Sequence, residues 1–193
     1  MTVDLGHNFQ SRNLKIEGAI EFRSLIRTDN RGHFARHFAN RMTGTEANFC
    51  VVEANISRTI QRHTFRGMHY QIPPYAESKL ISCLSGKVLD VIVDLRPQSP
   101  TYLKWESILL SEELNNSVYV PVGVANGYMS LDQNVLVHYY CSAAYSTSHE
   151  RGFRFNDKLI AIQLPSIPSV VSSKDLSWGD LNELDLKIFK TSL

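Results

Sequence analysis

The chain has 193 residues, 43% of them hydrophobic, with 20 Lys and Arg against 19 Asp and Glu. This length can bury a full core and favours a single domain, 1–193. A net charge of +1 provides no overall field for nucleic acid or a membrane surface, so any anion must be recognised locally. Residues 1–10 lack signal-peptide features, and no segment approaches the roughly 20 apolar residues of a membrane span. We therefore expect a soluble, cytoplasmic protein.

Strand-like segments recur along the chain, separated by turn residues. The expected strands are 20–26, 33–38, 49–57, 64–71, 79–84, 87–94, 105–110, 117–120, 135–142 and 152–155. Turn-forming Gly, Pro, Asn and Asp residues separate most of them. Short strands at this spacing predict an all-β sandwich or barrel.

Helical periodicity is weak. Short peripheral helices are expected at 39–42 and around Asp175, where Ser172 or Ser173 can act as the N-cap. The tail from Asp180 onward is polar and is expected to be peripheral. The three cysteines lie far apart without a Cys-x-x-Cys pair, and they are predicted to be buried reduced thiols: Cys50, Cys83 and Cys141.

The expected strand 64–71 holds the chain's most informative cluster of polar residues. It contains Arg66, His69 and Gln71, and Lys79 follows its turn. A histidine can exchange a proton near neutral pH, whereas an arginine stays charged and can clamp an anion. Alternation leaves Arg66 opposite the face of Phe65, His69 and Gln71, unless a bulge at Gly67 turns it inward. The cluster predicts a proton-moving site for an anionic substrate.

Three further polar residues fall on otherwise apolar strand faces. Alternation places Lys79, Asp90 and Tyr139 with apolar neighbours, so all three point inward. Lys79 and Asp90 could form a structural ion pair or belong to a polar cluster in a barrel mouth. Tyr139 could be an ordinary core residue or an acid. The strand pattern leaves these alternatives open.

A metal site is a rival interpretation of the same region. The segments around His69 and Asn126 resemble the two cupin motifs, whose usual histidines bind a transition metal. Gln71 and Asn126 stand where two of those histidines would be. One imidazole with amides is a poor ligand set for zinc or iron. We predict chemistry without a metal.

Motifs in order along most of the chain resemble the dTDP-4-dehydrorhamnose 3,5-epimerase family. The motifs are Asp29-x-Arg31-Gly32-x-Phe34, Arg66-Gly67-Met68-His69-Tyr70-Gln71, Lys79-Leu80, Asp90-Val91-x-Val93-Asp94-Leu95-Arg96, Ser99-Pro100-Thr101-Tyr102, Val120-Pro121-x-Gly123, Tyr139, Tyr145 and Gly152-x-Arg154-Phe155-Asn156-Asp157. The resemblance implies a jelly-roll, cupin-like β-barrel and a homodimer. It also implies epimerisation of a nucleotide-linked 4-keto-6-deoxyhexose without cofactor or metal. The favoured substrate is dTDP-4-keto-6-deoxyglucose.

The resemblance assigns roles residue by residue. It implies that His69 is the base, Asp175 its partner, Tyr139 the opposing acid and Lys79 the residue near the C4 oxygen. Arg31 and Arg66 would hold the diphosphate, and neighbouring Lys79 would help to lower the pKa of Tyr139. The full set of expected substrate-binding residues is Arg31, Phe34, Arg36, Glu53, Asn55, Arg66, Gln71, Asp90, Asn126 and Tyr145.

Three positions depart from the family pattern: Asn126 replaces a histidine, Glu53 a glutamine, and Arg36 an acidic residue. An arginine suits the acceptors of cytosine or guanine better than the N3–H of thymine. A CDP- or GDP-sugar is therefore an alternative substrate. An enzyme that inverts only C3 or only C5 is a further alternative, because such enzymes resemble the double epimerases. A metal-dependent cupin oxygenase or isomerase and a non-catalytic sugar-nucleotide binding protein are competing functions.

Overall fold

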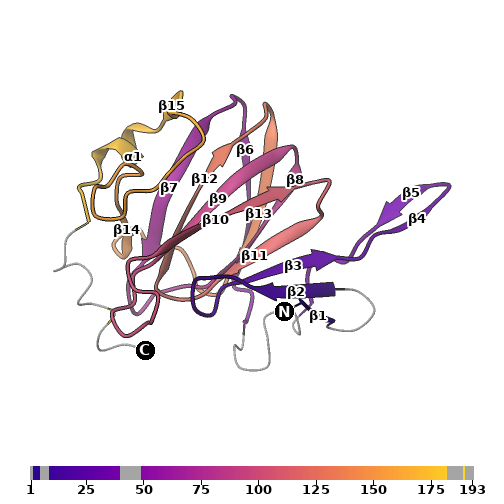
Figure 1. The fold of residues 1–193 in the computed structure, drawn as a ribbon, viewed down its shortest axis with the longest axis horizontal. Helices are drawn as coiled ribbons and strands as arrows, with labels where there is room; N and C mark the ends of the chain where they lie inside the picture. Colours follow the sequence, from indigo (N-terminus) through magenta and orange to yellow (C-terminus); the bar gives the residue numbers. More distant parts are fainter. Residues whose placement is uncertain (1, 5–8, 40–48, 182–188, 190–193) are drawn as a thin grey trace.

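The computed structural model of the protein describes residues 2–4, 9–39, 49–181 and 189. These residues form two large sheets, a hairpin and one short helix (Figure 1). The elements are β1 (Thr2–Asp4), β2 (Phe9–Asn13), β3 (Ile20–Ser24), β4 (Arg27–Asp29), β5 (Gly32–Phe34), β6 (Glu53–Thr59), β7 (Thr64–Gln71), β8 (Lys79–Ser85), β9 (Lys87–Asp94), β10 (Trp105–Ser111), β11 (Asn116–Val120), β12 (Val124–Ser130), β13 (Val135–Cys141), β14 (Glu150–Gly152), β15 (Val170–Val171) and α1 (Ser173–Ser177).

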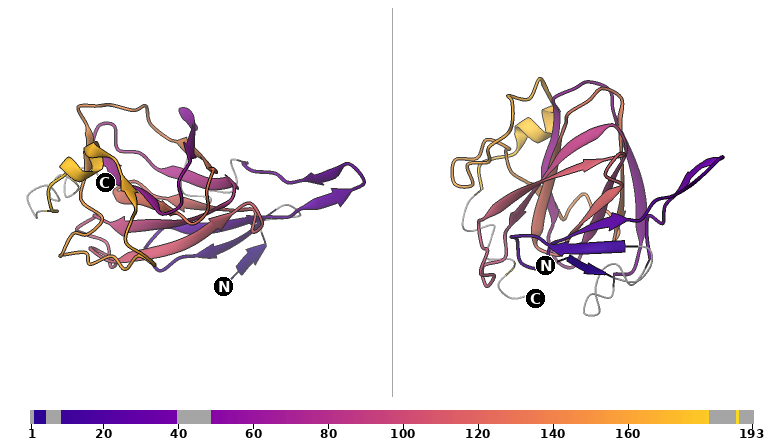
Figure 2. Two further views of the ribbon diagram at one scale, coloured as in Figure 1. Left: turned by 90° about the horizontal axis from the view of Figure 1, so that it is seen from above. Right: turned by 45° about the vertical axis from the view of Figure 1, so that its right-hand side comes forward.

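The two large sheets face each other in the order expected of a jelly roll. One has seven strands in the order β1-β2-β3-β11-β8-β13-β6. The other has the order β10-β9-β12-β7-β14, with β15 pairing in parallel with β7. Sequential strands repeatedly lie in opposite sheets, as β7 and β8 do. The all-β, cupin-like fold class is confirmed, and the two sheets pack as a sandwich (Figure 2).

The main core lies between the sheets, where inward-facing aliphatic residues of both sheets meet. Ile81 and Val137 of the seven-stranded sheet belong to the same cluster as Val88 and Ile92 of the six-stranded sheet. All four are buried, and burying each such side chain contributes roughly 1.5–3 kcal/mol. Polar residues at one end of the space between the sheets are therefore positioned by this packed apolar core.

The outer face of the six-stranded sheet is also covered. Phe65, Met68 and Tyr70 of β7 pack outward against Phe153 and other residues of the C-terminal segment. That segment also contributes Leu181 and Phe189 to the cluster, and both are buried. The expectation of a wholly peripheral tail beyond Asp180 is therefore wrong. Leu181 and Phe189 therefore tie the described part of this tail to the outer face of the six-stranded sheet.

Most expected strands are present, with shifted ends. β7 and β9 begin and end as predicted, while the segment 33–38 is a strand only as far as Phe34. β2 and β12 were not among the expected strands, and in β12 the Asn126-Gly127 pair breaks the strand pattern. Residues 40–42 of one expected helix lie outside the described residues, whereas Ser172 caps α1 as predicted. No described helix is long and apolar enough to cross a membrane.

The β4–β5 hairpin projects from the sandwich on the side away from β7 and α1 (Figure 1). Within the described part of the chain, its two strands, Arg27–Asp29 and Gly32–Phe34, pair only with each other. Phe34 keeps 61% of its surface exposed. Such an extended apolar and cationic arm is poorly stabilised by its own chain.

Candidate active site

A bulge in β7 determines which of its side chains face the space between the sheets. Opposite β12, the register runs from His69–Asn126 to Arg66–Tyr128, so β7 has one residue more than its partner. Gly67 within this bulge has φ +133°, and a Cβ there would lie 2.5 Å from the Cα of Gly127. The bulge brings Arg66 to the same side as His69, as the sequence allowed. It also sends Phe65 to the outer face, so the prediction that Phe65 shares the side of His69 is wrong.

Two adjoining cavities open at this end of the sandwich and share His69, Lys79 and Tyr139. The first has a volume of about 280 Å³, and its lining includes Arg66 and Asp175. The second has a volume of about 260 Å³, and its lining includes Glu53, Asn55, Gln71, Glu77, Tyr145 and Glu150. His69 lies on the six-stranded sheet, and Lys79 and Tyr139 lie on the seven-stranded sheet. A ligand between them would be approached from opposite sides.

His69 and Asp175 form a hydrogen-bonded pair. Nε2 of His69 lies 2.6 Å from Oδ1 of Asp175, and the Gly67 N–H donates to Oδ2 at 3.4 Å. Asp175 is buried, and burial raises its pKa, but the hydrogen bond and charge of His69 and further donors outweigh this effect, so the pKa is lowered overall. The ionised Asp175 favours a proton on Nε2. The lone pair of Nδ1 is then the basic site.

Asp175 reaches His69 because α1 places it there. The side chain of Ser172 accepts a hydrogen bond of 3.0 Å from the N–H of Asp175, which starts the helix. Trp178 follows the helix and packs onto Gly152 of β14, where a Cβ would lie 2.5 Å from its Nε1. The helix is thereby held against β7, near β14 (Figure 1). Its residues Lys174 and Asp175 line the first cavity.

Tyr139 presents its phenol from the opposite sheet. Its ring packs against the main core, and the residue lines both cavities. Burial raises its pKa to about 12, with smaller contributions from Cys141, Tyr128 and Glu77, and Arg66 acts in the opposite direction. The expectation that neighbours lower this pKa is therefore wrong, because desolvation of the phenolate exceeds the effect of the cation. Tyr139 stays protonated at neutral pH.

Lys79 is held by two acceptors at the base of the cavities. Its Nζ donates to Oδ1 of Asn126 at 3.0 Å and lies 3.2 Å from Oε1 of Glu77. Asp90 is fully buried close to Lys79 and Asn126, and neither carboxyl oxygen has a hydrogen bond of good geometry among the described residues. Burial raises the pKa of Asp90 well above its usual value, and Lys79 and Asn126 only partly offset this. Asp90 lies behind the cavity wall and lines neither cavity.

Several residues at the rim connect separate segments. Oε2 of Glu150 accepts hydrogen bonds from Lys174 at 2.5 Å and from the Tyr145 hydroxyl at 2.7 Å. Glu53 accepts from the Tyr145 N–H at 3.0 Å. The Gln71 side chain is committed to the backbone of Tyr75, Ala144 and Ser146. Gln71 thus fixes the loop that carries Tyr145.

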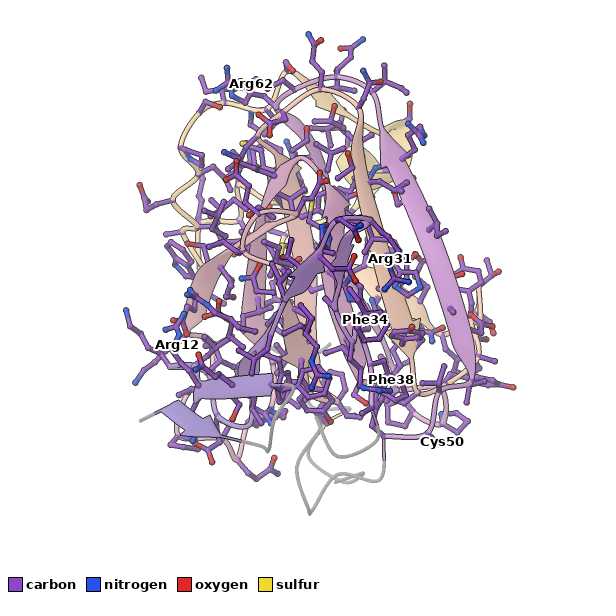
Figure 3. All side chains as sticks on the ribbon, turned by 90° about the vertical axis from the view of Figure 1, so that its right-hand side faces the viewer. Arg12, Arg31, Phe34, Phe38, Cys50 and Arg62 are labelled. Atoms are coloured by element: carbon purple, nitrogen blue, oxygen red, sulfur yellow. The ribbon has the colours of Figure 1, made fainter. Side chains whose placement is uncertain are left out.

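Three expected binding residues lie away from the two cavities, on or next to the β4–β5 hairpin. Arg31 and Phe34 are on the projecting hairpin, where Arg31 pairs with Asp29 at 2.6 Å and keeps 85% of its side chain exposed (Figure 3). Arg36 follows the hairpin and is also exposed. None of the three lines either cavity. The structure of one chain therefore does not bring Arg31 to Arg66.

Sequence reasoning missed Glu77, Glu150 and Lys174. The strand pattern could have found Glu77, which lies two residues before Lys79 and thus on its side, but not the two rim residues, whose loops carry no periodic signal. Cys83 and Cys141 are buried free thiols as predicted, but Cys50 is exposed because it precedes β6 instead of lying within a strand. No group of three His, Cys, Asp or Glu side chains suited to a metal ion occurs in the described part of the chain.

Comparisons with known proteins find relatives over most of the chain. Residues 13–183 match the family model described as dTDP-4-dehydrorhamnose 3,5-epimerase. A protein of that name from Sinorhizobium fredii is 39% identical over 158 residues, which cover 81% of each chain.

Two solved structures extend the comparison to ligand complexes. A dTDP-6-deoxy-D-glucose-3,5-epimerase from Legionella pneumophila, in complex with dTDP-4-keto-L-rhamnose, is 31% identical with a TM-score of 0.85; the match covers 93% of this chain and 96% of that one. A 3'-monoepimerase from Streptomyces bikiniensis, in complex with dTDP-quinovose, is 30% identical with a TM-score of 0.80, covering 86% and 85%.

Proposed function

Because the chain belongs to the dTDP-4-dehydrorhamnose 3,5-epimerase family, we propose that it is an isomerase that inverts C3 and C5 of dTDP-4-keto-6-deoxyglucose. The observation that carries this proposal is the placement of the His69–Asp175 pair and Tyr139 on opposite sides of one cavity. Inversion requires a proton to leave one face of the sugar and another to arrive at the opposite face. A base and an acid on facing sheets suit that requirement.

His69 acts as the base in this proposal. Its Nδ1 removes the proton at C3 or C5, and the electron pair of the broken C–H bond moves to the C4 oxygen as an enolate. Asp175 accepts the Nε2–H hydrogen bond and stabilises the imidazolium that forms. A positioned general base contributes roughly 10²- to 10⁴-fold in rate.

Lys79 and Tyr139 complete the reaction. Lys79 donates a hydrogen bond to the enolate oxygen inside a partly desolvated cavity, where such a donor has its greatest effect. Tyr139 then gives its proton to the face opposite His69, and proton exchange with solvent restores both residues. The raised pKa of Tyr139 ensures that the phenol holds its proton when the enolate forms. No cofactor or metal takes part in this sequence.

A nucleoside diphosphate fits the charge around the first cavity. Arg66 and Lys174 line it together with Lys79, and guanidinium and ammonium groups are the usual partners of phosphate oxygens. The relative from Legionella pneumophila with a bound dTDP-sugar supports dTDP as the carrier. CDP- and GDP-sugars remain the alternatives that the Arg36 and Glu53 substitutions suggest. The cytoplasmic location expected from the sequence also stays a prediction.

Inversion of a single carbon is the second candidate. The 3'-monoepimerase from Streptomyces bikiniensis has the same fold at 30% identity, so this fold also serves an enzyme described as acting on one carbon. His69 and Tyr139 would have the same roles in that case. The two candidates differ in how many carbon positions exchange a proton with solvent.

A homodimer would explain the position of the projecting hairpin. Arg31 and Phe34 are exposed on it and lie outside both cavities of their own chain. A second copy could receive this arm, bringing Arg31 to the partner's phosphate-binding side. Mixing inactive Arg31→Ala and His69→Ala proteins, after unfolding and refolding together, should restore part of the activity. No recovery, or a monomer by light scattering, would contradict this arrangement.

The function is tested by proton NMR in heavy water with dTDP-, CDP- and GDP-4-keto-6-deoxyhexoses. We expect solvent deuterium at C3 and C5 of the dTDP-sugar and none with His69→Ala. Deuterium at one carbon only would favour the single-site candidate. No incorporation with any of the three nucleotides would refute an epimerase.

A further inference from the structure

Glu77 is a mostly buried carboxylate in the second cavity that takes no part in the proposed proton transfers. Its side chain is 9% exposed and lies 3.2 Å from Nζ of Lys79, which is 14% exposed. Glu77 lines the second cavity together with His69, Lys79 and Tyr139. An ion pair this shielded from water needs good geometry to offset the cost of desolvation. Its position beside the proposed chemistry suggests a role in the reaction.

The hydrogen-bonding capacity of Lys79 suggests what that role is. An ammonium group has three N–H donors and no acceptor. One is used by Oδ1 of Asn126 at 3.0 Å, and a second is directed at Oε1 of Glu77. Asn126 lies on β12 of the six-stranded sheet, and Glu77 lies just before β8 of the other sheet. The ammonium is thus held from two sides, and one donor remains for a ligand.

We propose that Glu77 is a positioning residue that, with Asn126, fixes the Lys79 ammonium so that its third N–H points at the C4 oxygen of the bound sugar. A free lysine side chain has several rotatable bonds and would otherwise point its charge in many directions. Holding the donor before the enolate forms removes that reorganisation from the reaction. The inference rests on the proposed epimerase function and deepens it.

The electrostatic surroundings agree with this placement. Glu77 contributes to the raised pKa values of both Tyr139 and Cys141, in each case after the larger effect of burial. Its carboxylate is therefore close to the proposed acid as well as to Lys79. Asp90 does not replace it, because Asp90 lies behind the cavity wall with a strongly raised pKa and makes no direct ion pair with Lys79 within the described residues.

The first test compares two substitutions of Glu77 by the rate of deuterium incorporation into dTDP-4-keto-6-deoxyglucose. Glu77→Ala removes the acceptor and should lower kcat about tenfold or more, since a misdirected catalytic group costs rate at this scale. Glu77→Gln keeps an acceptor at the same length and should retain most of the activity. The dissociation constant for dTDP should not change in either variant, because Glu77 holds the lysine and not the nucleotide.

The second test asks whether Glu77 acts through Lys79. Lys79→Met should lower exchange by itself, and adding Glu77→Ala to it should cause no further loss, because the positioned group is already gone. A merely structural role would instead give the same loss in both backgrounds. Glu113→Gln is the control, since Glu113 forms an exposed ion pair with Lys87 at 3.4 Å, outside the two cavities.

Three results would overturn the inference: full activity of Glu77→Ala, equal losses in the two backgrounds, or a loss of dTDP binding that parallels the loss of exchange. If Lys79→Met does not fold, the Ala and Gln variants of Glu77 still decide, since equal loss in both would argue against an acceptor role. An inactive wild-type protein would refute the proposed function, and the inference with it. An active wild type with an unaffected Glu77→Ala refutes the inference alone.

Discussion

Nε2 of His69 and Oδ1 of Asp175 lie 2.6 Å apart although 106 positions separate them in the chain. The strand β7 supplies the imidazole, and the N-capped helix α1 supplies the carboxylate. Neither residue alone identifies a base, since a single inward histidine is usually structural. Their contact favours the tautomer with its proton on Nε2 and leaves the lone pair on Nδ1 of a residue that lines both cavities, which makes proton abstraction by Nδ1 chemically reasonable.

Asp175→Asn should lower kcat for deuterium exchange by roughly 10²-fold or more, because an amide can hold the wrong tautomer and cannot stabilise the imidazolium. Exchange is measured by NMR, and folding is checked by thermal denaturation. Ser177→Ala in the same helix is the control, since among the described residues the Ser177 hydroxyl bonds only to the carbonyl of Lys174, and it lies at the helix end. Unchanged exchange in Asp175→Asn would remove this residue from the mechanism.

Tyr139→Phe should separate proton removal from inversion. The variant keeps His69 and Lys79, so it can still form the enolate, but it lacks the donor on the opposite face. Deuterium should therefore still enter the starting sugar at a reduced rate, while epimerised product falls by roughly 10²-fold or more. Because the pKa of Tyr139 is raised to about 12, its ionisation should not limit wild-type activity below about pH 10. Full epimerisation by Tyr139→Phe would assign the acid to another group.

Asp90 should make the free energy of unfolding decrease as the pH rises. Its folded-state pKa is raised, chiefly by burial, so its contribution is fully present below the unfolded value of about 3.9 and is lost as the pH rises through the folded pKa. Asp90→Asn carries no such titration. Its free energy of unfolding in urea, relative to wild type, should therefore increase from pH 4.5 to pH 8, beyond the change seen for Glu113→Gln. Parallel curves would show that Asp90 is not held in its neutral form.

The sequence predicts the residues on regular strands better than their partners. Alternation placed Lys79 and Tyr139 inward, and both line the cavities. It could not decide the direction of Arg66, because a single extra residue in β7 reverses every side chain beyond it. The distance from Asp175 to His69 depends on how α1 docks onto a distant strand. Local pattern contains no information about that docking, and only the family resemblance pointed to it.

Gly152→Ala should displace α1, and with it Asp175, without changing a residue that lines either cavity. A Cβ at Gly152 would lie 2.5 Å from Nε1 of Trp178 and 2.6 Å from the carbonyl oxygen of Met68. Trp178 must move, and the helix that carries Asp175 moves with it. We expect a loss of roughly 1–3 kcal/mol in the free energy of unfolding and a reduced kcat for exchange.

Gly179→Ala is the matched control for this change, since a Cβ there meets nothing within 4 Å. It alters the same segment by the same methyl group and should preserve both stability and exchange. Crystals or NMR spectra of Gly152→Ala should show the His69–Asp175 contact lengthened, because β7 keeps the histidine in place while α1 shifts. A variant that loses stability but keeps full exchange and an intact contact would show that the Trp178 packing does not position Asp175.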